Sequence, residues 1–142
     1  MSGIIVGVDG SVHSRKALEY AAKEAAAHHT GLTVLTVHQA VRDVYGGVST
    51  YPDDAGLTDK ARQAAQADTD EVLSGLDERP ESVTVNAVHG LPAEELVKAS
   101  EGADLLVVGR RGGGGFARLT MGSVTSAVTQ HAHSPVLIVA HD

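Results

Sequence analysis

Short apolar runs alternate with amphipathic stretches along the whole chain. Residues 4–8 read Ile-Ile-Val-Gly-Val, an almost wholly apolar run typical of a strand that is covered on both faces. After the Asp-Gly-Ser turn at 9–11, alanines and one leucine recur at helical spacing and predict an amphipathic helix. Ser11 or Ser14 is expected to cap this helix, and Gly31 is expected to end it in a left-handed conformation.

The remaining elements follow the same alternation. Strict apolar-polar alternation over 82–88 is typical of an edge strand, and residues 39–56 are rich in turn residues and predict a long loop. The pattern predicts further strands at 32–37, 103–108 and 136–139, and helices from Thr58 to about Leu76, from Pro92, and from Gly122 to Ala132.

Strands that alternate with helices of this length imply right-handed crossovers and a parallel sheet between two helix layers. The sequence therefore predicts an α/β three-layer sandwich with five parallel strands, organised as one domain over residues 1–142. Ligands of such sheets bind at the carboxyl ends of the strands, where the strand order reverses. The two strand ends richest in loop residues follow Val8 and Val108, so both are expected at the same edge of the sheet.

Composition narrows the class of partner. The formal net charge of −7 argues against nucleic-acid binding, and no apolar run approaches the ~20 residues that span a bilayer. The chain has no cysteine, and its start lacks the features of a signal peptide, so we expect a cytoplasmic protein without membrane contact. Residues 105–141 carry Arg110, Arg111 and Arg118 and no acid. This local positive charge fits an anionic ligand, and equally a solvated loop.

The stretch from 109 to 125 has the order of a phosphate site: strand end, glycine loop, helix start. Glycines let backbone amides approach a phosphate closely, and the first turn of a helix presents amides and a favourable dipole to an anion. The amides of Gly122, Ser123 and Val124 and the hydroxyls of Ser123 and Thr125 are the candidate donors. The four consecutive glycines at 112–115 are also compatible with a flexible linker.

A phosphate site of this kind is by itself too weak to bind a nucleotide. A helix terminus contributes ~0.3–1 kcal/mol per charge at an exposed site, whereas micromolar binding needs about 8 kcal/mol. An apolar pocket for a base must supply much of the remainder. Val8, Val37 and Val108, at or near the ends of three predicted strands, are the candidate walls.

Other phosphate and catalytic motifs do not fit. No lysine follows Gly112 at P-loop spacing, and residues 7–10 are not a dinucleotide fingerprint. The eight histidines include the close pairs 28–29 and 131–133, which lack the spacing of metal ligands on one helix face. The sequence therefore predicts no catalytic residue and no metal ligand among them. Asp9 is either a ligand contact or only a cap of the turn.

One resemblance covers the whole chain. The spacing Gly109, two residues, Gly112, nine residues, Gly122-Ser123 resembles the nucleotide signature of the universal stress protein family. The opening Ile-Val-Gly-Val-Asp-Gly-Ser at 5–11 and the ending His-Ala-His-Ser-Pro-Val-Leu-Ile-Val at 131–139 are also similar to this family. The resemblance implies the strand order 3-2-1-4-5, and ATP binding in members that keep the glycine signature.

The resemblance also implies roles for single residues. Asp9 would reach the ribose or a bound metal, and Val37 would meet the adenine through its backbone. Arg110 and Arg111 stand where the family varies, so their contact with phosphate is open. The predicted nucleotide-binding set is Gly7, Val8, Asp9, Val37, Val108, Gly109, Arg110, Arg111, Gly112, Gly122, Ser123, Val124 and Thr125.

These observations predict an ATP-binding stress-response module, at most a weak ATPase, with ATP alone or with Mg²⁺ as its cofactor. The alternatives are an ATP-dependent substrate-activating enzyme of the same superfamily and a nucleotide-free structural dimer. Residues 136–139 are apolar on both faces, yet the implied order places them at a sheet edge. A homodimer through this strand would cover them, as would the chain's own helices.

Overall fold

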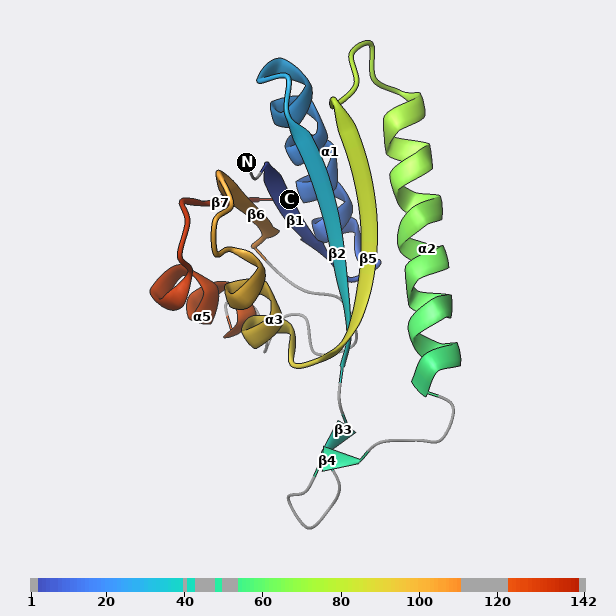
Figure 1. The fold of residues 1–142 in the computed structure, drawn as a ribbon, viewed down its shortest axis with the longest axis vertical. Coiled ribbons are helices and arrows are strands. Elements are labelled where there is room, and N and C mark those ends of the chain that lie inside the picture. The colour runs from blue at the N-terminus through green and yellow to red at the C-terminus, as the bar shows by residue number, and fades with distance from the viewer. Residues whose placement is uncertain (1–2, 40, 43–47, 50–53, 111–122, 141–142) are drawn as a thin grey trace.

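The computed structural model describes residues 3–39, 41–42, 48–49, 54–110 and 123–140. Five parallel strands form one sheet in the order β5-β2-β1-β6-β7 (Figure 1). Counted along the chain within this sheet, the order is 3-2-1-4-5, so the predicted fold class is confirmed. The strands are β1 (Ile4–Val8), β2 (Gly31–Gln39), β5 (Ser82–Gly90), β6 (Leu105–Gly109) and β7 (Val136–Val139).

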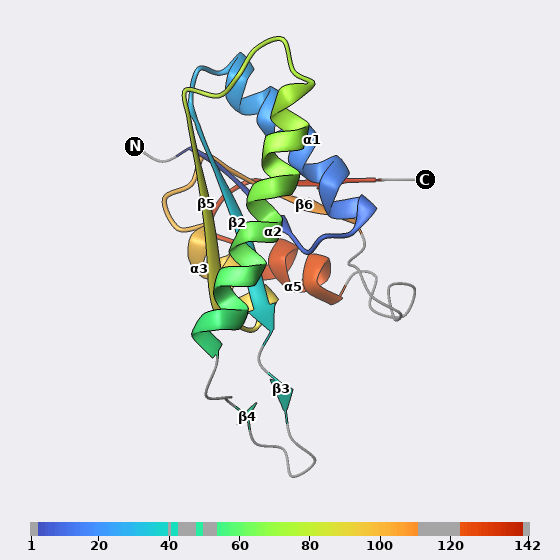
Figure 2. The same ribbon diagram turned by 90° about the vertical axis from the view of Figure 1, so that its right-hand side faces the viewer.

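Helices cover both faces of this sheet (Figures 1 and 2). Helices α1 (Val12–Ala27) and α2 (Asp54–Ser74) pack on one face, and α3 (Pro92–Ala99) and α5 (Ser123–His131) pack on the other. The first face is built from alanines of α1 and valines of the central strands, which allow a close approach of helix to sheet. The second face contains Leu35, Leu96, Leu106, Val108 and Val128.

The central strand β1 distributes its residues between these two cores. Ile4, Val6 and Val8 are buried against α1, while Ile5 packs on the α3 side. Gly7 also faces α3, and a Cβ placed on it would lie 2.8 Å from Cδ2 of Leu96. Glycine at position 7 is therefore explained by the close packing of α3 on the sheet.

The start of α1 is as predicted and its end is not. The hydroxyl of Ser11 accepts the backbone N–H of Ser14 at 3.1 Å, which confirms the serine cap. The predicted cap at Gly31 is wrong, because α1 ends at Ala27 and the left-handed residue is His29 with φ 52°. Gly31 begins β2 instead, where a Cβ would lie 2.7 Å from Oγ of Ser82.

The described parts of segment 39–56 differ from the predicted long loop, and residues 40, 43–47 and 50–53 lie outside the described residues. A short antiparallel hairpin, β3 (Val41–Arg42) with β4 (Val48–Ser49), lies in this segment, and α2 already starts at Asp54. The edge position of β5 is confirmed. Val83 and Val85 pack against the α1–α2 core, while Ser82, Thr84 and Asn86 are exposed on the other side.

Arg15 ties α1 to α2. Its guanidinium lies 3.4 Å from Oδ1 of Asp68 and 2.6 Å from Oε1 of Glu71. The hydrogen bond from Arg15 holds the pKa of Glu71 below its ordinary value. These two ion pairs join the two helices of one layer at their solvent-facing side.

The packing at Gly7 yields a stability prediction. Gly7→Val places extra methyl groups against Leu96, and overpacking of this kind costs ~1–3 kcal/mol. We expect urea denaturation to show this loss of stability. In a chain that already carries Leu96→Ala, Gly7→Val should cost less stability than it does in the parent chain. Gly56→Ala is the matched control, because a Cβ at this position of α2 meets nothing within 4 Å. A Gly7→Val protein as stable as the parent chain would contradict the packing explanation.

Candidate functional site

The turn after β1 and the end of β6 lie side by side at one edge of the sheet. β1 and β6 are parallel neighbours, with Val6 opposite Val107, so the chain leaves both strands at the same edge. β2 flanks β1 on its other side, with Thr36 opposite Val8. The carboxyl ends of three adjacent strands therefore meet at the place that the sequence predicts for a ligand.

The turn at residues 9–11 is held by its own side chains. Oδ1 of Asp9 accepts the backbone N–H of Ser11 at 2.9 Å, and Gly10 has a φ of 85°, a conformation that favours glycine. The backbone N–H of Asp9 donates to Oγ of Ser14 at 3.1 Å. Asp9 thus caps the turn, which is one of the two roles that the sequence suggests for this residue. The same contacts fix the position of its carboxylate at the sheet edge.

A side-chain hydrogen bond fastens α5 to the end of β6. Oγ1 of Thr125 donates to the carbonyl of Gly109 at 3.0 Å. The Thr125 hydroxyl proton is therefore directed to the backbone, which differs from its expected role as a donor to phosphate. The first turn of α5 still presents its backbone amides, because the first four N–H groups of a helix have no acceptor within it.

The three candidate wall valines divide between the two faces of the sheet. Val8 belongs to the α1–α2 core, whereas Val37 and Val108 belong to the α3–α5 core. Val8 and Val108 are buried, and Val37 is partly exposed. Among the three, only Val37 has side-chain surface left for a base at this edge.

Comparison with known proteins gives the family. A model described as the universal stress protein family matches residues 1–140. This chain belongs to the universal stress protein family. A universal stress protein of Mycobacterium tuberculosis is 39% identical over 138 residues, which are 95% of this chain and 44% of the relative. The chain spans about half the length of the curated relatives that it matches.

Solved structures of the family share the fold. A universal stress protein crystallised in complex with cAMP superposes with a TM-score of 0.67 at 27% identity, covering 98% of this chain and 96% of the other. A universal stress protein from Lactobacillus plantarum gives a TM-score of 0.71 at 23% identity, covering 97% of each chain. The second likeness shows the fold alone.

In this family member, ten of the thirteen predicted site residues lie in the described part of the chain. Arg111, Gly112 and Gly122 lie outside it. The ten come from the carboxyl ends of β1, β2 and β6 and from the first turn of α5, so the fold brings them to one edge. Arg110 follows β6 with an exposed side chain, and its backbone N–H donates to the carbonyl of Val139 at 3.0 Å.

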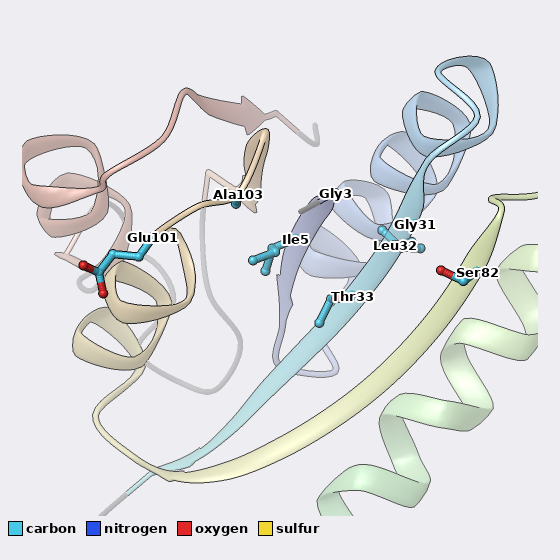
Figure 3. Close-up of a pocket in the computed structure, with 8 residues that line it drawn as sticks. All are labelled: Gly3, Ile5, Gly31, Leu32, Thr33, Ser82, Glu101 and Ala103. Carbon is cyan, nitrogen blue, oxygen red and sulfur yellow. The ribbon is translucent and has the colours of Figure 1, made fainter. Parts of the chain in front are cut away.

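A pocket of about 230 Å³ lies at the opposite edge of the sheet (Figure 3). It is formed by the amino ends of β1, β2 and β5 and by the turn before β6, and sequence reasoning missed it because no motif marks strand starts. Its one carboxylate, on Glu101, is turned away from Ile5 and Gly3 in Figure 3. The lining residues are Gly3, Ile5, Gly31, Leu32, Thr33, Ser82, Glu101 and Ala103. This pocket does not coincide with the predicted nucleotide residues.

In the described ranges, no three or more His, Asp or Glu side chains gather in a way that could hold a metal ion. Over the same ranges, no helix is both long and apolar enough to cross a bilayer.

The Thr125 contact can be tested by removing one hydroxyl. Thr125→Val keeps the side-chain shape but leaves the Gly109 carbonyl without this donor, so we expect a loss of ~0.5–1.5 kcal/mol in urea denaturation. Thr125→Ser retains the hydroxyl and should recover most of this loss. Thr129→Val is a control in the same helix, because its hydroxyl bonds only within α5, to the Ser126 carbonyl. Equal losses at positions 125 and 129 would contradict a special role for the contact to β6.

Proposed function

We propose that this universal stress protein binds ATP at the carboxyl ends of β1, β2 and β6, as one nucleotide-binding domain. One observation carries the proposal: β1 and β6 are neighbours, so the Asp9 turn and the start of α5 serve the same edge of the sheet. Neither segment could hold a nucleotide by itself. Together they would supply backbone amides for an anion and a fixed carboxylate at one edge of the sheet.

The phosphates would be held by backbone amides. The first turn of α5, at Ser123 and Val124, presents N–H groups and the positive end of the helix dipole. The exposed guanidinium of Arg110 adds positive charge beside this turn. The glycine signature that the sequence predicts, with Gly112 and Gly122, would extend the amide seat.

The base and ribose would lie toward β2 and β1. Val37 offers partly exposed apolar surface, and its backbone lies at the sheet edge one residue beyond Thr36, the partner of Val8. The carboxylate of Asp9 is held by its turn, and we expect it to meet a ribose hydroxyl or a bound Mg²⁺. The relative crystallised with cAMP carries an adenine nucleotide and shares the fold at 27% identity, which supports this class of ligand.

We expect regulation rather than rapid catalysis. Oδ1 of Asp9 is engaged by the turn, and the predicted set contains no histidine or glutamate that could serve as a base for water. The protein would act as a stress-response module whose surface depends on the bound nucleotide, with hydrolysis at most slow. A cytoplasmic location remains a prediction of the sequence.

Calorimetry tests the nucleotide site. The parent chain should bind ATP in the presence of MgCl₂ with micromolar affinity, which corresponds to about 8 kcal/mol. Gly122→Val puts side-chain bulk at the predicted phosphate seat and should lower the affinity at least tenfold. Gly56→Ala, far along the chain in α2, should bind as the parent does. Unchanged affinity in Gly122→Val would refute the site, and no heat from the parent chain at millimolar ATP would favour the nucleotide-free alternative.

We also propose a homodimer through β7. This strand pairs only with β6 in the described sheet, and Ile138 is 40% exposed although it lies in an apolar run. An edge strand of this kind exposes unpaired backbone groups as well as apolar side chains. A second copy related by a two-fold axis would cover both.

Sedimentation velocity tests the dimer. Ile138→Lys places a charge on the exposed edge and should shift the protein toward monomer at micromolar concentration. Tyr20→Lys is the matched control, because Tyr20 is 48% exposed on α1 and lies outside β7. A parent chain that sediments as a monomer, or a Tyr20→Lys protein that dissociates equally, would contradict the proposed interface.

A further inference from the structure

Two histidines face each other on neighbouring strands at the carboxyl end of the sheet. His38 of β2 and His89 of β5 are direct register partners in the parallel pairing of these strands. Their ring centres lie 5.2 Å apart, and the ring planes are inclined at 40°. Parallel partners project their side chains from the same face, so the two imidazoles form a pair on one surface of the sheet.

This face is the one that α1 and α2 cover. Counting by twos from Val34 on β2 and from Val85 on β5, both in the α1–α2 core, leads to His38 and His89. The first turns of α2 lie beside the carboxyl ends of the two strands in both views (Figures 1 and 2). Both histidines are half-buried. They are held by the sheet and still reachable from solvent.

Imidazole pairs of this kind are ligands for late first-row metals. Neutral histidine binds Zn²⁺, Cu²⁺ and Ni²⁺ through a ring nitrogen, at ~2.0–2.1 Å for zinc. Two nitrogens on one tetrahedral ion at that distance lie roughly 3.3 Å apart. Rings with centres 5.2 Å apart can bring one nitrogen each to this separation by small rotations about the side-chain bonds. The backbone pairing supplies the preorganisation, because neither strand can move alone.

We infer that His38 and His89 form a two-histidine site for a divalent transition metal ion. The remaining positions on the ion are filled by water, so the site is an open one of moderate affinity. The affinity follows the order of intrinsic metal preference, with Cu²⁺ above Zn²⁺ and Ni²⁺. This site is separate from the proposed nucleotide seat, since the side chains of His38 and its neighbour Val37 point to opposite faces of the sheet.

The competing explanation is a ring contact that only packs the end of the sheet. Tilted aromatic rings at this separation are ordinary neighbours. The two explanations differ in what a metal does. If the two rings only pack together, a metal ion should bind them no more tightly than it binds the other histidines of the chain. If they form a chelate, both rings should bind the same ion at once.

The test uses the intact chain, free of nucleotide, and the added probe is CuCl₂. In titrations followed by NMR, substoichiometric Cu²⁺ should broaden the ring signals of His38 and His89 together, before those of His28 and His131. Calorimetry should give one site whose Cu²⁺ affinity falls at least tenfold in His38→Asn and, separately, in His89→Asn. The two losses should not add in the double variant, because either single change already destroys the chelate.

His28→Asn is the matched control, because His28 is an exposed histidine that is paired with Glu24 at 3.2 Å. Its removal should leave the first Cu²⁺ affinity unchanged. Far-UV circular dichroism checks the fold of each variant, and the NMR arm on the parent chain needs no variant. Even broadening over all histidines, or parent-like affinity in either single variant, would overturn the inference. Loss of ATP binding in Gly122→Val with Cu²⁺ binding intact would show the two sites to be independent.

Discussion

The hydrogen-bonded ladder of β1 with both of its neighbours is the constraint on which the structure depends. β1 is only five residues long, yet it pairs with β2 on one side and β6 on the other. Both of its faces are covered, so its residues must alternate between two cores. Gly7 shows how tight this arrangement is, because the room for its missing side chain is filled by Leu96. A strand this short and this enclosed leaves no freedom in register.

That register determines what the carboxyl edge can do. The turn after β1 is pinned by Asp9, Ser11 and Ser14, and α5 is pinned to Gly109 by Thr125. Both segments are local in sequence, but their mutual placement follows only from the pairing of β1 with β6. At the same edge, the pairing of β2 with β5 brings His38 opposite His89. Parallel pairing thus brings separate loops and strand ends together at one edge of the sheet.

Much of the fold could be predicted, because apolar runs and helical spacing are local signals. The strand order came from the family resemblance, and the sheet confirms it. The end of α1 was mispredicted because glycine is the usual left-handed residue, whereas here His29 takes that conformation and Gly31 makes room for Ser82. The short hairpin β3–β4 has too few residues to give a periodic pattern. In the site, the faces of Val8 and Val108 and the partner of Thr125 could not be predicted, because each depends on where β6, α3 and α5 lie relative to β1. The contact of His38 with His89 joins residues 51 positions apart and has no signal in the sequence at all.

The two borders of the sheet differ in chemistry. β5 exposes Ser82, Thr84 and Asn86 beside its free border, while β7 exposes Ile138. Chains whose two borders attract each other can add head to tail without limit and grow into fibres. Here the polar border at β5 and the apolar border at β7 do not complement each other, so growth by continued strand addition is disfavoured. Association of two molecules through the apolar border would bury that border in both of them, so no further copy could add there.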